Sequence, residues 1–134
     1  MSKEDTKDLQ LSSSLGGMKG NVFEQIVEHF PDIIHSVDSK GIIFSTNEFA
    51  SELVGYGKDE LIDKSIYDIY PPGIRARVKK GFEQLKKEGF KDRVESQLVS
   101  KTGEIIDVEI RSLSLYDEEG KFIRTFSIIR DMRK

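Results

Sequence analysis

DIIHSVDSKGIIFSTN, residues 32–47, holds two short β-branched segments on either side of a turn. The turn is Asp38-Ser39-Lys40-Gly41, and its glycine can adopt the positive φ that such turns often require. The stretch therefore predicts a β-hairpin with a histidine, His35, inside its first strand. Two interpretations of His35 follow: a core residue whose ring is hydrogen-bonded, or a group that contacts a ligand.

The residues before this hairpin divide into a tail and a helix. Residues 1–20 end in LSSSLGGMKG, and this Ser/Gly composition predicts a flexible tail. Residues 21–30 carry apolar side chains at helical spacing before Pro31, which predicts a short amphipathic helix. Its apolar residues are Phe23, Ile26, Val27 and Phe30. We expect one domain over residues 21–134, a length that suits a single core.

The residues after the hairpin predict helices first and strands afterwards. Short helical pieces broken at Gly55 and Gly57 follow Asn47, which can cap the first of them. The longest helix starts at the two prolines 71–72 and ends at Gly89. Strand-like segments then cover residues 94–100, 104–116 and 121–130, joined by the hairpin turns KTG and DEEG. This order predicts an α+β fold, a five-stranded antiparallel sheet with helices on one face.

Composition limits the classes of function. The chain has no cysteine and two histidines, which excludes disulfides and thiolate metal sites and argues against any metal centre. No apolar run reaches the roughly 20 residues of a membrane-spanning helix, so we expect no membrane insertion. The polar amino-terminal residues lack the apolar stretch of a secretory signal, and the expected location is the cytoplasm.

Nucleic-acid binding and catalysis find little support in the sequence. The net charge is -3, although residues 75–93 hold eight basic and three acidic residues, a pattern typical of a solvated helix face. Arg75 or Arg77 in this segment can alternatively reach a ligand carboxylate. Ser36, His35 and Asp38 lie too close along one strand to form a nucleophile triad, so we expect no enzyme.

The order of elements and several short motifs resemble the PAS sensor domain. These motifs are the hairpin D-x-K-G, VGYGKDEL, KTG, DEEGK and RDM, and they cover residues 22–133 in the succession that the family shows. One departure is Asp63, where the family often has glycine. The resemblance implies a cavity between sheet and helices that binds haem, flavin, another chromophore or a small metabolite, or that is filled in a dimerisation module.

The same resemblance disfavours flavin and haem as cofactors. The reactive cysteine of the light-sensing subtype would fall near Ser65 or Ile66, and the polar flavin-holding positions match the apolar Leu98, Val108 and Ile129. The haem-binding subtype takes its axial histidine from the long helix, which has none here. The expectation is an empty cavity or one that holds a small metabolite.

Strand alternation and the family comparison together predict the cavity lining. On the first strand Ile33, His35 and Val37 share one face, which the resemblance makes the cavity side. The candidate ligand-binding residues are His35, Val37, Ile42, Phe49, Leu53, Ile66, Ile69, Val78, Phe82, Leu98, Ile106, Val108, Ser127 and Ile129. The alternative is that these side chains pack against one another and leave no site.

The carboxyl-terminal residues give the clearest indication of function within the family resemblance. IIRDMRK matches the strand-ending aspartate motif that precedes an output domain, such as a histidine kinase or a cyclase, and Asp131 is the expected signal relay. Phe126 and Ile128 should face outward from the last strand. Either the helix at residues 21–30 or a second subunit is expected to cover them, and we expect a homodimer.

Overall fold

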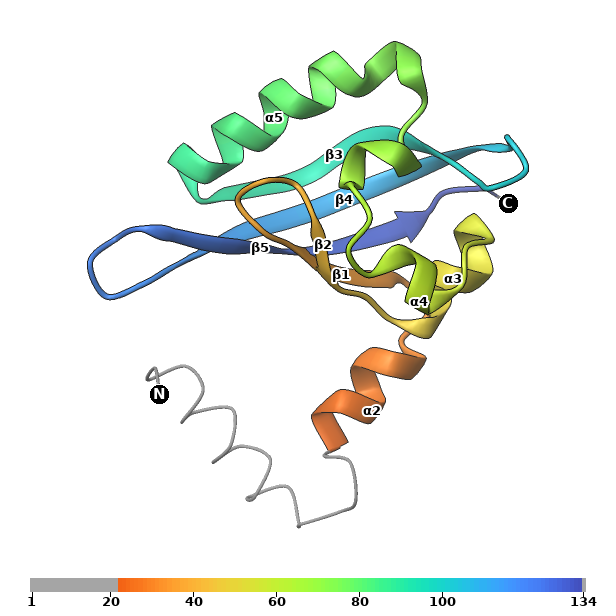
Figure 1. The fold of residues 1–134 in the computed structure, drawn as a ribbon, viewed down its shortest axis with the longest axis horizontal. Helices are drawn as coiled ribbons and strands as arrows, with labels where there is room; N and C mark the ends of the chain where they lie inside the picture. Colours follow the sequence, from red (N-terminus) through yellow and green to blue (C-terminus); the bar gives the residue numbers. More distant parts are fainter. Residues whose placement is uncertain (1–21, 134) are drawn as a thin grey trace.

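The computed structural model describes residues 22–133, and Figure 1 shows its fold. The predicted tail at residues 1–20 lies outside the described residues. The elements are α2 (Val22–His29), β1 (Ile33–Val37), β2 (Ile43–Ser45), α3 (Glu48–Val54), α4 (Lys58–Leu61), the 3-10 turns η1 (Ile66–Ile69) and η2 (Pro72–Ile74), α5 (Arg75–Glu88), β3 (Phe90–Val99), β4 (Ile105–Tyr116) and β5 (Phe122–Asp131).

The five strands form one antiparallel sheet in the order β2-β1-β5-β4-β3. The chain leaves the sheet after β2, forms the helical segments, and returns to the far edge at β3. The antiparallel sheet with its helical block confirms the predicted α+β class. The hairpin turn also forms as expected, because Gly41 has φ +82° and its N–H donates to the Asp38 carbonyl.

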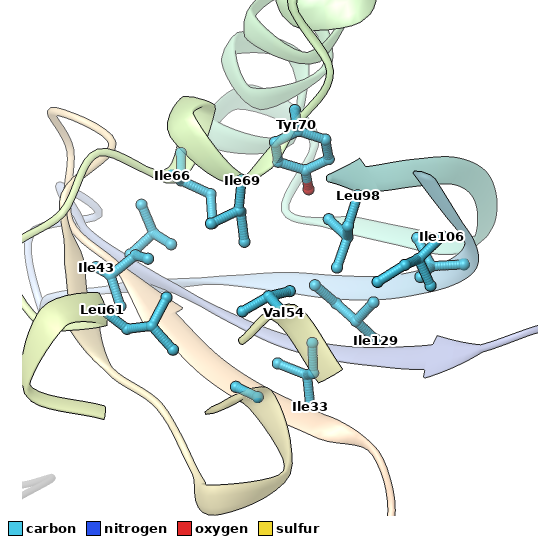
Figure 2. Close-up of a cluster of buried hydrophobic side chains, with 13 residues drawn as sticks. Ile33, Ile43, Val54, Leu61, Ile66, Ile69, Tyr70, Leu98, Ile106 and Ile129 are labelled. Carbon is cyan, nitrogen blue, oxygen red and sulfur yellow. The ribbon is translucent and has the colours of Figure 1, made fainter. Parts of the chain in front are cut away.

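A hydrophobic core joins the inner face of the sheet to the helical block. Figure 2 shows its buried side chains, in which Leu98, Ile106 and Ile129 from the sheet lie beneath Ile69 and Tyr70 from the connecting segment. Three of these side chains, Leu98, Ile106 and Ile129, have no exposed surface at all. Since burial of one Leu or Ile side chain contributes about 2 kcal/mol, this cluster provides the main stabilisation of the fold.

Asn47 ties three segments together from a fully buried position. It is the N-cap residue of α3, as predicted, but its side chain makes no hydrogen bond to that helix. Instead its Oδ1 accepts a hydrogen bond from the Ile34 N–H, and its Nδ2 donates to the carbonyls of Val27 and Asp32. The amide group suits this position because it offers both an acceptor and two donors.

The pairing of β1 with β2 decides which side chains of the hairpin face the core. The ladder between β1 and β2 shifts register at Ser36/Val37, and Ile43 rather than Ile42 is buried in the core. Ile42, which was predicted to line the cavity, is half-buried, because Ile43 pairs with Val37 and takes the inward position. Thr125 of β5 compensates for the irregularity, since its Oγ1 accepts a hydrogen bond from the Val37 N–H.

Strand β3 has a bulge of its own. The ladder with β4 shifts between Lys91 and Val94, and Arg93 has φ +51° within this interval. Strand β3 thus begins at Phe90, four residues before the predicted start, and carries Lys91 onto the inner face. Asp63, the position at which the family often has glycine, also has a left-handed conformation, with φ +72°. That backbone conformation is the one that glycine adopts without strain.

Helix α2 stands apart from the sheet. Figure 1 shows it projecting from the end of the domain, and none of its eight residues is buried. Its contacts with the body include the Asn47 hydrogen bond and an ion pair between Glu28 and Lys58, at 2.6 Å. Since α2 does not lie across the outer face of β5, it is not the cover expected for Phe126 and Ile128. Both of those side chains are half-buried.

No helix within residues 22–133 is both long and apolar enough to cross a membrane.

Candidate functional site

A cavity of about 500 Å³ lies between α5 and the inner face of the sheet. Strands β1, β3, β4 and β5 form its floor, and η1 and α5 close it from the other side. Six of the predicted ligand-binding residues line it: His35, Val37, Ile66, Val78, Phe82 and Ser127. The volume falls within the range of about 300 to 1,000 Å³ that is usual for small-molecule sites.

The other predicted residues do not reach this cavity. Ile69, Leu98, Ile106, Val108 and Ile129 belong to the core cluster, where they pack against one another. Phe49 and Leu53 are half-buried against the same cluster, while Ile42 is half-buried outside it. For these positions the packing interpretation describes the structure better than the cavity interpretation. Leu98, Ile106, Val108 and Ile129 lie toward one end of the sheet, and the cavity lies toward the other.

His35 is buried beside the cavity with no partner for its ring. Its side chain is 5% exposed, and neither ring nitrogen makes a hydrogen bond with any residue in the described range 22–133. Among residues 22–133 the only fully enclosed side-chain N or O atom without a hydrogen-bond partner is Ser51 Oγ. The unpaired nitrogens of His35 are therefore not fully enclosed and border open space. Burial lowers the pKa of His35 to about 4, which keeps the imidazole neutral at pH 7.

Ser127 is not the hydrogen-bond partner that its position opposite His35 would allow. Its hydroxyl lies 2.6 Å from the Ser112 hydroxyl on β4. A neutral imidazole presents one N–H donor and one acceptor nitrogen, and both are available to a molecule in the cavity.

Tyr70 adds a second polar group to the lining. In Figure 2 its ring extends from the segment after η1 toward the sheet. It is 6% exposed, and its hydroxyl has no hydrogen-bond partner among residues 22–133. Burial raises the pKa of Tyr70, so the phenol remains protonated. Arg75 holds the backbone here, because its Nε donates to the Tyr70 carbonyl at 3.0 Å.

A row of polar side chains crosses the cavity floor. His35 of β1 pairs in register with Ser127 of β5, Ser127 with Ser112 of β4, and Ser112 with Lys91 of β3. All four line the cavity. We call these residues the polar row. It runs from the buried imidazole to a lysine at the sheet edge.

The cavity opens between α5 and β3, since every exposed residue of its lining comes from one of these two elements. The exposed lining residues are Arg77, Lys80, Gln84, Val94 and Glu95. Lys91 crosses this opening, because its Nζ donates to Gln84 Oε1 at 2.8 Å. The side chains of Arg77, Lys80 and Glu95 make no hydrogen bond or ion pair within the described residues. The opening thus carries three positively charged side chains, those of Arg77, Lys80 and Lys91, and one negatively charged side chain, that of Glu95.

Sequence reasoning missed several lining residues, of which Ser112, Tyr70 and Lys91 are the most informative. Ser112 follows Val108 at two alternations along β4, so continuing the inward pattern would have found it. A serine reads as outward-facing in a pattern based on hydrophobicity, which is why it was missed. Lys91 could not have been found, because the bulge that carries it inward has no clear sequence signal.

Asp131 lies at the end of β5 and is joined to the residues that follow. Its Oδ1 accepts hydrogen bonds from the backbone N–H and Nε of Arg133, and its Oδ2 lies 3.1 Å from Arg133 Nη2. This side-chain contact lowers the pKa of Asp131. Arg133 also pairs with Glu104 in the turn between β3 and β4. The strand end is therefore linked to a neighbouring loop.

The described residues, 22–133, contain no group of three or more His, Cys, Asp or Glu side chains with the geometry to hold a metal ion.

Comparison with known proteins places this geometry in a family. The PAS fold model matches residues 22–132. The chain is also similar to the methyl sulfide methyltransferase-associated sensor of Methanosarcina acetivorans, with 28% identity over 113 residues. That alignment covers 84% of the chain and 11% of the sensor, so the chain spans a small part of the sensor's length.

Solved structures share the fold. The PAS domain of a protein from Colwellia psychrerythraea superimposes with a TM-score of 0.74 at 22% identity, covering 81% of this chain and 92% of that one. A domain of the sensory box sensor histidine kinase/response regulator from Geobacter sulfurreducens gives 0.72 at 20% identity, covering 94% and 99%. At these identities the likeness shows a common fold.

Proposed function

This chain belongs to the PAS family, and we propose that it is a sensory module that binds a small molecule in the cavity beneath α5 and controls an output domain. The observation that carries the proposal is the imidazole of His35. It borders the cavity without a partner among residues 22–133. A buried polar group without a hydrogen bond costs about 1 to 3 kcal/mol, and a ligand that pairs with it offsets this cost.

The lining supports a binding site rather than a poorly packed core. Apolar side chains such as Val78 and Phe82 surround a few polar groups, which is the usual composition of small-molecule sites. The core cluster, in contrast, is filled by aliphatic side chains that are almost fully buried. The two regions are adjacent and share Val37, Ile66 and Tyr70, which form the boundary between them.

Filling the cavity tests this function. We expect the purified protein to carry a stoichiometric small molecule in native mass spectrometry, and Val78→Phe to lose it, because the larger ring occupies the space. Val99→Phe is the matched control, since Val99 lies on β3 outside the lining and should keep the molecule. If the wild type is empty and no compound in a broad metabolite screen raises its melting temperature, the sensory proposal is wrong.

The output domain is proposed to follow β5, with Asp131 as the relay. The similarity to a domain of a sensor histidine kinase supports a kinase as one such output, and a cyclase is another. Asp131 is suitably placed, because it joins the strand end to Arg133 and, through it, to the turn at Glu104. Movement of the sheet edge can thus reach the residues after β5.

A homodimer formed through α2 is the second part of the proposal. Phe23 and Ile26 on this helix are 49% and 54% exposed, and a second copy offers matching apolar surface by symmetry. We expect the double variant Phe23→Glu/Ile26→Glu to sediment as a monomer, while the wild type sediments as a dimer. Phe44→Glu, at an exposed phenylalanine on β2, should leave the dimer intact. A monomeric wild type at micromolar concentration would rule out this interface.

A further inference from the structure

The polar row and the cations at the cavity opening indicate what kind of molecule the cavity takes. This inference rests on the proposed sensory function. We propose that the ligand is a small, elongated carboxylate whose far end carries a neutral hydrogen-bonding group, with the carboxylate at the opening and the neutral group beside His35.

The buried end of the cavity requires a neutral partner. His35 lies there with both ring nitrogens unpaired, on β1, the floor strand farthest from the opening beside β3. The pKa of His35, lowered to about 4, means that the imidazole carries no charge to balance an anion at pH 7. Burial of a charge without a counter-charge is far costlier than burial of a hydroxyl, so a hydroxyl or carbonyl suits this end.

The open end favours an anion. Arg77 and Lys80 on α5 and Lys91 on β3 border it, against the single carboxylate of Glu95. Neither Arg77 nor Lys80 has an ion-pair partner among residues 22–133. The whole chain carries a net charge of -3, so this positive opening is a local feature. Charge-assisted hydrogen bonds to a carboxylate are about twice as strong as neutral ones.

The spacing of the strands sets the length of the ligand. The polar row spans β1, β5, β4 and β3, which are three interstrand gaps, or about 14 Å between the outer backbones. Side chains at both ends shorten this span, which leaves room for a molecule about 10 Å long. A phenol with a short carboxylate chain has these dimensions, and its ring would lie against Val78 and Phe82.

Three related probes separate the two ends in a calorimetric titration of the whole chain. They are para-hydroxyphenylpropionate, its amide, which lacks the charge, and phenylpropionate, which lacks the hydroxyl. We expect the hydroxy acid to bind about tenfold more tightly than the amide and about fivefold more tightly than phenylpropionate. The preference for the acid should weaken at high salt, because the opening is exposed.

Variants assign each preference to its residues. Arg77→Gln and Lys91→Gln should each reduce the preference for the acid over the amide to threefold or less, with the preference for the hydroxyl unchanged. His35→Leu should reduce the preference for the hydroxyl and leave the preference for the acid unchanged. Lys79→Gln is the matched control, because it removes the same charge from α5 at a position outside the lining, and it should behave as wild type.

The outcomes distinguish this inference from the sensory function on which it rests. Equal affinity for acid and amide, or an acid preference that survives both charge variants, overturns the inference and leaves a ligand-binding cavity in place. Failure of all three probes to bind, in a protein that carries a neutral molecule after purification, also overturns it. A protein that binds no small molecule at all overturns both. The expected pattern of affinities, with its loss in the matching variants, supports the inference.

Discussion

Asn47→Ala is expected to lower the free energy of unfolding by about 4 kcal/mol at pH 7, the largest effect of any single change considered for this protein. The truncation leaves the Ile34 N–H without its acceptor and the carbonyls of Val27 and Asp32 without their donor. It also opens a cavity at a site with no exposed surface. Urea denaturation followed by circular dichroism measures the loss.

Thr46→Ala provides the control for Asn47. Thr46 is the adjacent buried residue, and its side chain makes no hydrogen bond within the described part of the chain. The Thr46→Ala substitution should lower the free energy of unfolding by about 1 kcal/mol or less. Hydrogen exchange adds a local measure, because the amides of α2 should lose protection in Asn47→Ala as the tie to Val27 is removed. A loss below 1 kcal/mol would mean that water replaces the three hydrogen bonds.

Acid should destabilise the protein through His35. Burial lowers the pKa of this histidine from 6.5 to about 4, so below pH 6.5 the unfolded chain takes up a proton that the folded chain resists. The stability that the neutral ring provides is complete above pH 6.5 and declines as the pH falls toward 4. Over this interval the free energy of unfolding should decrease by about 3 kcal/mol from His35 alone.

Urea titrations at a series of pH values, without added ligand, isolate this contribution. His35→Leu should lack the part of the slope that lies between pH 6.5 and 4, whereas His29→Leu, at an exposed position on α2, should keep it. Arg77, Lys80 and Lys91 border the same cavity and also oppose a charged imidazole, while Glu95 favours one. Identical slopes in wild type and His35→Leu would show that water in the cavity solvates the charged ring.

Much of the fold could be predicted from the sequence because its signals are local. Glycine at 41, 55 and 89 marks turns and helix ends at which the backbone has positive φ. The alternation of IIHSV placed Ile33, His35 and Val37 on one face, where Ile33 packs in the core and His35 and Val37 line the cavity. These features depend on neighbouring residues, which the sequence displays directly.

The candidate site was harder to predict because it depends on long-range register. Alternation tells which face a residue occupies, but not how far along the strand the core gives way to the cavity. Leu98 and Ile129 share the inner face with Ser127, yet they pack in the core while Ser127 borders the open space. A bulge adds to the difficulty, since the shift after Lys91 carries the Lys91 side chain into the cavity lining.

The bulge in β3 also bears on the solubility of the domain. Strand β3 is the last in the sheet, and its outer edge has no neighbouring strand within residues 22–133. A straight edge of ten residues would offer a template on which strands of other chains could assemble into aggregates. The left-handed residue Arg93 bends the edge, and the charged side chains of Lys91, Asp92 and Arg93 lie at the bend. The bulge that carries the Lys91 side chain into the cavity lining thus also protects the edge of the sheet from pairing with strands of other chains.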